Sequence, residues 1–168
     1  MSRKVLIPNI VTLANLLLGI VSLVYTMDSK YQIAATAILL AMVLDGMDGR
    51  IARKLDVTSN FGKELDSLCD LVSFGVAPAI LVYSSILQDM GHIGLIIAVT
   101  FALCGAIRLA RFNVINITTH FVGVPITFAG SLMALSILLS NKIPLIVFPF
   151  LTVLLSYLMV SNFKVPKY

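Results

Sequence analysis

Residues 45–53 read Asp-Gly-Met-Asp-Gly-Arg-Ile-Ala-Arg, and after eight further residues positions 62–70 read Gly-Lys-Glu-Leu-Asp-Ser-Leu-Cys-Asp. The 26 residues from 45 to 70 contain six carboxylates, three glycines and four basic side chains. The rest of the chain is predominantly apolar, since 59% of all 168 residues are hydrophobic and only 12% are charged. This concentration of charge marks the stretch as the candidate functional site, and the apolar segments around it decide the fold.

The composition is typical of a polytopic membrane protein, with a mean hydropathy of +1.02. A helix needs about 20 residues to cross about 30 Å of hydrocarbon. The apolar segments between the polar breaks approach that length. We therefore predict an all-α membrane protein, a six-transmembrane-helix bundle that forms a single domain over residues 1–168. The predicted helices cover residues 6–27, 31–54, 62–88, 92–113, 122–140 and 143–162.

The basic residues predict how the bundle is oriented. If the N-terminus is cytoplasmic, only Lys30 and Lys142 lie on the outer side. The other ten fall on the cytoplasmic side, as the positive-inside rule requires: Arg3, Lys4, Arg50, Arg53, Lys54, Lys63, Arg108, Arg111, Lys164 and Lys167. Both termini and the charged stretch are then cytoplasmic. Because these residues are dispersed between apolar spans, the net charge of +4 does not indicate nucleic acid.

Helical periodicity gathers the unusual residues of each segment on one face, because a helix turns by about 100° per residue. On the segment 31–54 that face holds Asp45, Asp48, Gly49, Ala52 and Arg53. On the segment 62–88 it holds Gly62, Asp66 and Asp70. The connection between the two segments is short, so the two faces can lie opposite each other.

The four aspartates predict a metal site. Intramembrane carboxylates are costly unless they are paired, and two cations, Arg53 and Lys63, cannot neutralise four of them. Oxygen-only ligands suit Mg²⁺ or Mn²⁺ better than zinc. Two such ions about 3.5–4 Å apart would leave open positions for a phosphate. The small residues on the same faces leave room for a ligand, and Arg53 can bind a phosphate bidentately, so we predict a binuclear site for a diphosphate.

Two simpler interpretations compete with this one. In the first, the glycines and alanine permit close helix packing and the carboxylates form structural ion pairs. In the second, the aspartates belong to a divalent-cation transporter. The packing interpretation suits any one of these residues by itself better than it suits the whole pattern. The transporter explains the carboxylates but not Ala52, Arg53 or the small residues on the same face.

The spacing Asp-x2-Asp-Gly-x2-Ala-Arg-x8-Gly-x3-Asp-x3-Asp is the signature of the CDP-alcohol phosphatidyltransferases, which this chain resembles without a departure. The resemblance implies a six-helix membrane enzyme that displaces CMP from a CDP-linked lipid with an alcohol. It implies metal ligation by Asp45, Asp48, Asp66 and Asp70, with Asp70 also acting as the base. It further implies a CMP pocket lined by Gly49, Ala52 and Gly62, and a diphosphate held by Arg53.

Within this family the chain most resembles the integral-membrane phosphatidylserine synthases. The similar blocks are residues 8–19, 64–78, 107–113, 121–125 and 156–160. This resemblance implies L-serine as acceptor, CDP-diacylglycerol or CDP-archaeol as donor, and a homodimer. Glycerol 3-phosphate or an inositol phosphate remains the alternative acceptor, although a phosphorylated acceptor would call for a denser basic pocket.

Two further groups of polar residues are candidates for the same site. Arg108, Arg111 and Asn113 stand near the cytoplasmic end of the fourth predicted helix, where they would receive the acceptor carboxylate or a phosphate. Snorkelling is the alternative for the arginines. The first helix carries a polar stripe of Pro8, Thr12, Asn15, Gly19 and Ser22. On this helix we assign nucleotide and phosphate contacts to Asn9, Thr12 and Asn15, with helix packing as the alternative.

The remaining reactive side chains carry less information. Cys69 and Cys104 form no metal or disulfide pattern and are interpreted as packing residues. His120 falls in a loop near the site, where a solvated side chain is the simpler interpretation. Glu64 lies off the metal face and is interpreted as a residue that orders the loop or forms a salt bridge.

Overall fold

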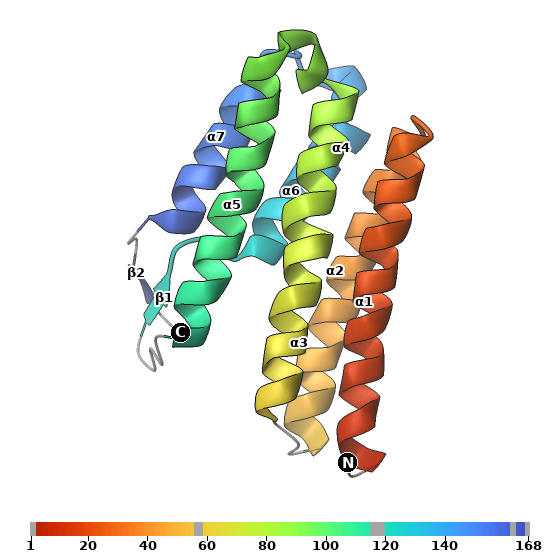
Figure 1. Ribbon diagram of the computed structural model, residues 1–168, viewed down its shortest axis with the longest axis vertical. Coiled ribbons are helices and arrows are strands. Elements are labelled where there is room, and N and C mark those ends of the chain that lie inside the picture. Colours follow the sequence, from red (N-terminus) through yellow and green to blue (C-terminus); the bar gives the residue numbers. More distant parts are fainter. Residues whose placement is uncertain (1–2, 56–58, 115–119, 162–163, 167–168) are drawn as a thin grey trace.

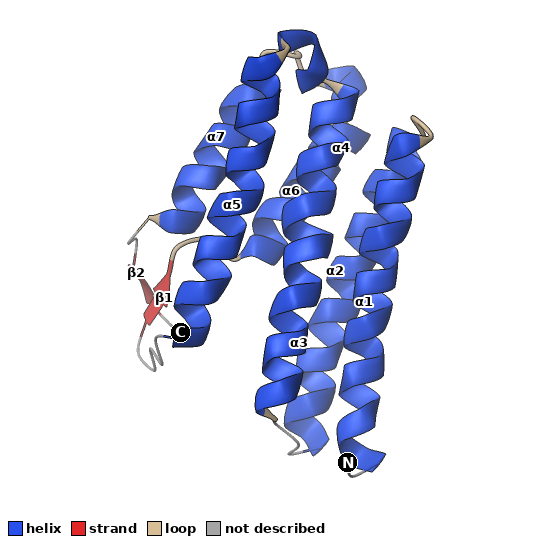
Figure 2. Ribbon diagram, in the orientation of Figure 1, coloured by secondary structure: helices blue, strands red, loops and turns tan. Residues whose placement is uncertain are grey.

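The computed structural model describes residues 3–55, 59–114, 120–161 and 164–166, with side chains described except at 3–7, 48, 51–55, 120–122 and 164–166. Over this part of the chain the fold is a bundle of helices with one short two-stranded ribbon (Figure 1 and Figure 2). The elements are α1 (Arg3–Met27), α2 (Tyr31–Leu55), α3 (Asn60–Asp70), η1 (Leu71–Val76), α4 (Ala77–Ser85), η2 (Leu87–Met90), α5 (His92–Val114), β1 (His120–Val122), α6 (Ile126–Leu138), η3 (Ser140–Lys142), α7 (Val147–Val160) and β2 (Lys164–Pro166).

Helix α1 carries its polar side chains inside and its large apolar side chains outside. The buried set is Asn9, Thr12, Asn15, Ser22 and Thr26. The exposed set, each between 45% and 59% accessible, is Ile10, Leu13, Leu17, Ile20 and Val24. A helix in water would bury the second set. This inverted pattern is expected of a helix whose outer face contacts lipid and whose inner face contacts protein.

Three helical stretches of the described chain are long and apolar enough to cross a membrane. They are Pro8–Met27, Asn60–Ser85 and His92–Val114, with mean hydropathies of 2.0, 1.7 and 2.2. Three shorter apolar helices accompany them: Tyr31–Met47, Ile126–Leu138 and Val147–Val160. The fold is thus a helical bundle with the length and composition of a membrane protein.

The predicted helix 62–88 is interrupted in the middle. Residues Leu71–Val76 form a π-helical turn between α3 and α4. Pro78, at the start of α4, has no N–H to donate to the carbonyl of Phe74, which lies four residues earlier. A wider helical turn at this place accommodates the missing bond. The turn follows directly after Asp70, so it sets where the continuing chain leaves the candidate site.

Close backbone contacts hold the neighbouring helices against this π-helical turn. A Cβ placed on Gly130 of α6 would fall 2.4 Å from the carbonyl oxygen of Phe74. A Cβ on Gly19 of α1 would fall 2.5 Å from Ser73 Oγ. Both separations are shorter than a van der Waals contact, so only glycine allows α1 and α6 to approach this closely.

The end of the chain departs from the predicted helices at 122–140 and 143–162. Helix α6 begins only at Ile126, after Pro125, and α7 runs from Val147 to Val160. Residues 120–122 instead form β1, which pairs antiparallel with β2 so that Phe121 lies opposite Val165. Gly123, with a φ of +75°, turns the chain from β1 towards α6. His120 therefore belongs to a strand, and its side chain lies outside the described residues.

The buried core lies where α4, α5, α6 and α7 meet the π-helical turn. Its largest side chains include Phe74, Phe101 and Phe148, each at most 1% exposed. On the other side of the bundle α1 packs along α2 and against α3. The C-terminal half of α2 and all of α3 lie at the end of the molecule where α1 begins and β2 lies (Figure 1). The candidate site is therefore built beside the core, towards that end.

Candidate active site

Three aspartates from two helices converge at the centre of the predicted site. Asp45 comes from α2, and Asp66 and Asp70 stand one turn apart on α3. A carboxylate oxygen from each lies within 4.8 Å of those of the other two. Asp70 is buried, with 8% of its surface exposed, and the other two are half-buried. We call Asp45, Asp66 and Asp70 the carboxylate triad; the side chain of Asp48 lies outside the described residues.

The start of α3 is fixed locally by an N-cap. Ser59 has an extended backbone, and its hydroxyl oxygen accepts a hydrogen bond from the N–H of Gly62 at 3.0 Å. A serine in this position satisfies one of the free amides at the helix start. Because Asp66 and Asp70 follow within three turns, the cap also fixes the rotation at which they face α2.

Two neutral side chains contact the triad from other helices. Nδ2 of Asn15, on α1, donates to Asp70 Oδ1 at 3.2 Å. The side chain of Thr127, in the first turn of α6, is hydrogen-bonded to Asp45, which also lies within hydrogen-bonding reach of Asp70. Four helices thus contribute to one cluster. Sequence reasoning missed Thr127; its only signal was a hydroxyl just after Pro125, at the start of a helix.

The triad fits a divalent cation. Carboxylates this close repel one another in a partly buried place unless a cation or a proton lies between them. Arg108, on α5, is near enough to interact electrostatically with Asp70, but one arginine cannot balance three carboxylates. The donor atoms are all oxygens, which suit Mg²⁺ or Mn²⁺. The structure therefore provides a cluster that would hold such an ion.

Of the residues predicted to bind the nucleotide, Asn9 on α1 and Gly62 on α3 lie next to each other. Asn9 is buried, and its Oδ1 lies 3.1 Å from where a Cβ on Gly62 would stand. Thr12 is buried and donates to the carbonyl of Pro8 at 3.0 Å. Gly49 on α2 is exposed, and a Cβ there would meet nothing within 4 Å. The side chains of Ala52 and Arg53 lie outside the described residues.

The three predicted acceptor residues, all on α5, have different partners in the structure. Arg108 is half-buried and approaches Asp70. Arg111 is exposed and donates from Nη1 to the carbonyl of Val160 at the end of α7, at 2.9 Å. Nδ2 of Asn113 donates to Glu64 Oε2 at 3.2 Å and to Ser67 Oγ at 3.0 Å, which ties α5 to α3.

The cysteines and the outward residues behave as packing and surface groups. Cys69 is buried and Cys104 is half-buried, and neither forms a disulfide within the described residues. Glu64 accepts a hydrogen bond from Asn113, which agrees with the interpretation of Glu64 as an ordering residue rather than a metal ligand. Lys63 lies 5.7 Å from the ring centre of Phe112. These contacts join the ends of α3 and α5 next to the triad.

An apolar-surfaced bundle with a carboxylate cluster of this kind defines a membrane protein equipped to hold a divalent cation. A family model described as CDP-alcohol phosphatidyltransferase matches residues 5–161. The chain belongs to the CDP-alcohol phosphatidyltransferase family. That family is generally dependent on divalent metal ions, which agrees with the geometry of the triad.

Several curated relatives carry a more specific name. The CDP-diacylglycerol–serine O-phosphatidyltransferase of Bacillus subtilis is 40% identical over 163 residues, covering 96% of this chain and 90% of the relative. The Helicobacter pylori protein of the same name is 39% identical over 172 residues, covering 97% and 73%. The archaetidylserine synthase of Methanothermobacter thermautotrophicus is 35% identical over 165 residues, covering 96% and 70%.

Proposed function

We propose that this membrane enzyme transfers the phosphatidyl group from CDP-diacylglycerol, or its archaeal counterpart CDP-archaeol, to the hydroxyl of L-serine and releases CMP. The observation that carries the proposal is the carboxylate triad, whose buried member Asp70 is oriented by Asn15. The similar bacterial and archaeal proteins named for serine transfer support the choice of acceptor.

The reaction is an in-line displacement at the phosphorus that bears the lipid. The serine oxygen forms a new bond to that phosphorus, and the bond from phosphorus to the CMP oxygen breaks, so that CMP leaves with the electron pair. Asp70 takes the proton of the serine hydroxyl. A carboxylate in a cationic site has a low proton affinity, so proton removal must accompany the attack rather than precede it.

The metal site consists of Asp45, Asp48, Asp66 and Asp70 in this proposal. Two ions, Mg²⁺ or Mn²⁺, would neutralise charge on the diphosphate and stabilise departing CMP. Arg53 holds the diphosphate from the end of α2. Asn9, Thr12, Gly49, Ala52 and Gly62 form the nucleotide side, where small residues let the ligand approach the backbone.

The arrangement in the membrane extends the same proposal. Six spans place both termini, β1, β2 and the triad on the cytoplasmic side, where CDP-linked lipid, serine and CMP meet. The ten basic residues predicted on that side support this orientation. Residues 1–168 act as one catalytic domain, and two copies form a homodimer. Protease treatment of tags at both termini in sealed inside-out vesicles tests the orientation, because cytoplasmic tags are then on the outside, and protection of either tag would contradict it.

The proposed function is tested with purified protein, CDP-diacylglycerol and either Mg²⁺ or Mn²⁺. Labelled L-serine, glycerol 3-phosphate and an inositol phosphate are supplied separately, and CMP and labelled lipid are measured. Serine alone is expected to give both products. CMP release that requires glycerol 3-phosphate or inositol phosphate would show that this compound, and not serine, is the acceptor. Cation flux without CMP release would identify a transporter.

A further inference from the structure

Asn15 faces the triad with an amide whose orientation is determined by its neighbour. The residue has no exposed surface. An ionised carboxylate only accepts hydrogen bonds, so the amide nitrogen must be the atom that faces Asp70, at 3.2 Å from Oδ1. The other amide atom, Asn15 Oδ1, is buried and has no hydrogen-bond partner among the described residues. Buried polar atoms are rarely left in this state unless a ligand or water satisfies them.

The unsatisfied oxygen lies next to the reacting carboxylate. The oxygen and nitrogen of one amide are about 2.3 Å apart, which follows from the bond lengths of the amide group. Asn15 Oδ1 therefore lies beside the same Asp70 that Nδ2 contacts. An acceptor atom in this position is suited to a donor on the molecule whose hydroxyl Asp70 deprotonates.

Arg108 supplies an unsatisfied atom of the opposite kind. It reaches the same region from α5, and its charge interacts with that of Asp70. Its Nε–H is buried and has no hydrogen-bond partner in the described part of the chain. A guanidinium N–H is suited to a carboxylate, because the charge-assisted bond is strong and directional.

We propose that Asn15 and Arg108 form the acceptor subsite, in which the two charged groups of an amino acid are recognised on either side of Asp70. The ammonium group of serine donates to Asn15 Oδ1, and its carboxylate accepts from Arg108 Nε. The hydroxyl then lies against Asp70. This inference rests on the proposed function and moves Asn15 from the nucleotide side of the site to the acceptor side.

Asn15 lies on a part of α1 that is held by contacts with the π-helical turn. The backbone carbonyl of Asn15 accepts a hydrogen bond from Ser73 Oγ at 3.1 Å. Gly19, one turn further along α1, lets that serine approach, since a Cβ there would stand 2.5 Å from Ser73 Oγ. The close contact between α1 and the π-helical turn therefore holds the side chain of Asn15 in place before an acceptor binds.

The other predicted acceptor residues have different partners. Arg111 contacts the carbonyl of Val160, and Asn113 contacts Glu64 and Ser67. These bonds join helix ends. The acceptor subsite therefore includes only Arg108 from the predicted group of Arg108, Arg111 and Asn113.

The test compares serine with two analogues that each lack one charged group, using the full-length protein and CDP-diacylglycerol. 3-Hydroxypropanoate lacks the ammonium and ethanolamine lacks the carboxylate; both are measured as competitors of labelled serine. Asn15→Leu is expected to raise the KM for serine about 10- to 100-fold and to weaken ethanolamine, but to leave 3-hydroxypropanoate nearly unchanged. Arg108→Gln is expected to show the converse selectivity. The KM for the CDP-lipid should stay near the wild-type value in both.

Ser22→Ala is the matched control, because Ser22 is also buried on α1, with a hydroxyl that has no partner among the described residues, but lies two turns beyond Asn15. It should keep the wild-type KM for serine. If Asn15→Leu does not fold, Asn15→Ser replaces it, with the same change in selectivity expected from the shorter side chain.

An unchanged KM for serine in Asn15→Leu would overturn the inference, as would equal weakening of both analogues or a raised KM for the CDP-lipid alone. Wild-type protein without serine-dependent CMP release would overturn the proposed function instead. The two failures are therefore distinguishable.

Discussion

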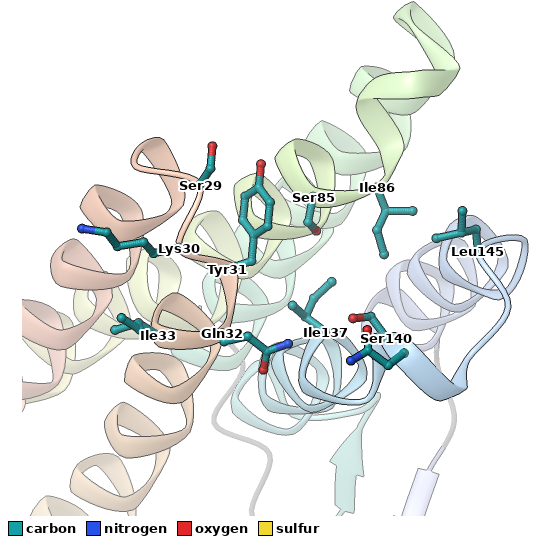
Figure 3. Close-up of a pocket in the computed structure, with 11 residues that line it drawn as sticks. Ser29, Lys30, Tyr31, Gln32, Ile33, Ser85, Ile86, Ile137, Ser140 and Leu145 are labelled. Atoms are coloured by element: carbon teal, nitrogen blue, oxygen red, sulfur yellow. The ribbon is translucent and has the colours of Figure 1, made fainter.

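Polar side chains cluster at both ends of the bundle. The two clusters differ in whether their polar atoms have partners within the protein. At one end a groove of about 510 Å³ is lined by the α1–α2 turn, the end of α4, and η3 with its neighbours. In Figure 3 Gln32 extends towards Ile137 and Ser140, while the amino group of Lys30 points away from Ile86. We call this the turn-end groove.

Lys30 and Tyr31, two of the polar residues that line the turn-end groove, have partners within the protein. Lys30 Nζ lies 3.6 Å from Asp28 Oδ2 and 5.6 Å from the ring centre of Tyr25. The hydroxyl of Tyr31 donates to the carbonyl of Ser84 at 3.0 Å. The charge of Lys30, the one charged residue among the described residues that line the groove, is therefore already paired within the protein.

In the carboxylate triad, by contrast, groups of the same charge lie close together. Like charges are crowded within 4.8 Å, and neutral side chains from α1 and α6 hold two of them in position. Beside them, Asn15 and Arg108 keep buried polar atoms without a described partner. The comparison indicates that the candidate chemistry lies where carboxylates crowd together beside buried polar atoms without a described partner, and not where the groove is. Each expected result below tests or refines that difference.

The largest effect is expected for Asp70→Asn. The amide cannot accept the proton of the acceptor hydroxyl, so turnover should fall by about 10³-fold or more. Much of the affinity for CMP should remain, because Asp70 is only one of several groups around the nucleotide. The measurement is CMP release together with CMP binding.

Lys30→Gln, in the turn-end groove, is the control for Asp70→Asn and should retain wild-type turnover. Full activity of Asp70→Asn would remove Asp70 as the base. An inactive Lys30→Gln with normal folding would show that the turn-end groove also takes part in the reaction.

The next effect concerns metal. Treatment with EDTA should abolish activity, and added Mg²⁺ or Mn²⁺ should restore it. Removing one ligand oxygen charge in Asp45→Asn should lower activity by about 10- to 100-fold, with partial recovery at higher metal concentration. The measurement is a metal titration of the wild type and the variant. Activity that resists EDTA and is unchanged in Asp45→Asn would contradict the role of the triad as a metal site.

A smaller effect is expected at the contact that sequence reasoning missed. Thr127→Val removes the hydroxyl hydrogen-bonded to Asp45, so activity should fall about 10-fold, whereas Thr127→Ser should stay near wild type. Thr36→Val is the matched control, because Thr36 is exposed on α2 and its hydroxyl donates to the carbonyl of Gln32 in the same helix. Wild-type kinetics in Thr127→Val would show that Asp45 needs no orientation from α6.

The smallest effect is expected for Arg111→Gln. The change removes the hydrogen bond from Arg111 to the carbonyl of Val160 at the end of α7. This bond is exposed, so it should contribute less than about 1 kcal/mol to the free energy of unfolding. The unfolding temperature in detergent should fall slightly, and the KM for serine should stay as in the wild type. A large rise in that KM would return Arg111 to the acceptor subsite.

Sequence reasoning reached the triad because its spacing is local. Asp66 and Asp70 share a face in any α-helix, and the short link from α2 brings Asp45 near them. The same argument locates Asn9 and Gly62 only to a helix face; their proximity follows from how α1 packs on α3. The aspartate core of the site could therefore be predicted, while its surroundings required the fold.

The features that could not be predicted from the sequence depend on tertiary contacts. The sequence predicts Arg111 and Asn113 at the same end of the bundle as the aspartates, but their hydrogen bonds to α7 and α3 depend on how those helices pack against α5. The π-helical turn depends on Pro78 and on the close approach of Gly130, which no helical period reveals. The ribbon between β1 and β2 joins segments more than 40 residues apart, so neither strand has a local partner to predict it.

The most direct test of the account is the stoichiometry of the products formed by purified protein from CDP-diacylglycerol and labelled L-serine. One labelled lipid is expected for each CMP released, in wild type and in Lys30→Gln, with both products lost together in Asp70→Asn. CMP released without serine in the lipid, or labelled lipid formed by Asp70→Asn at the wild-type rate, would contradict the account.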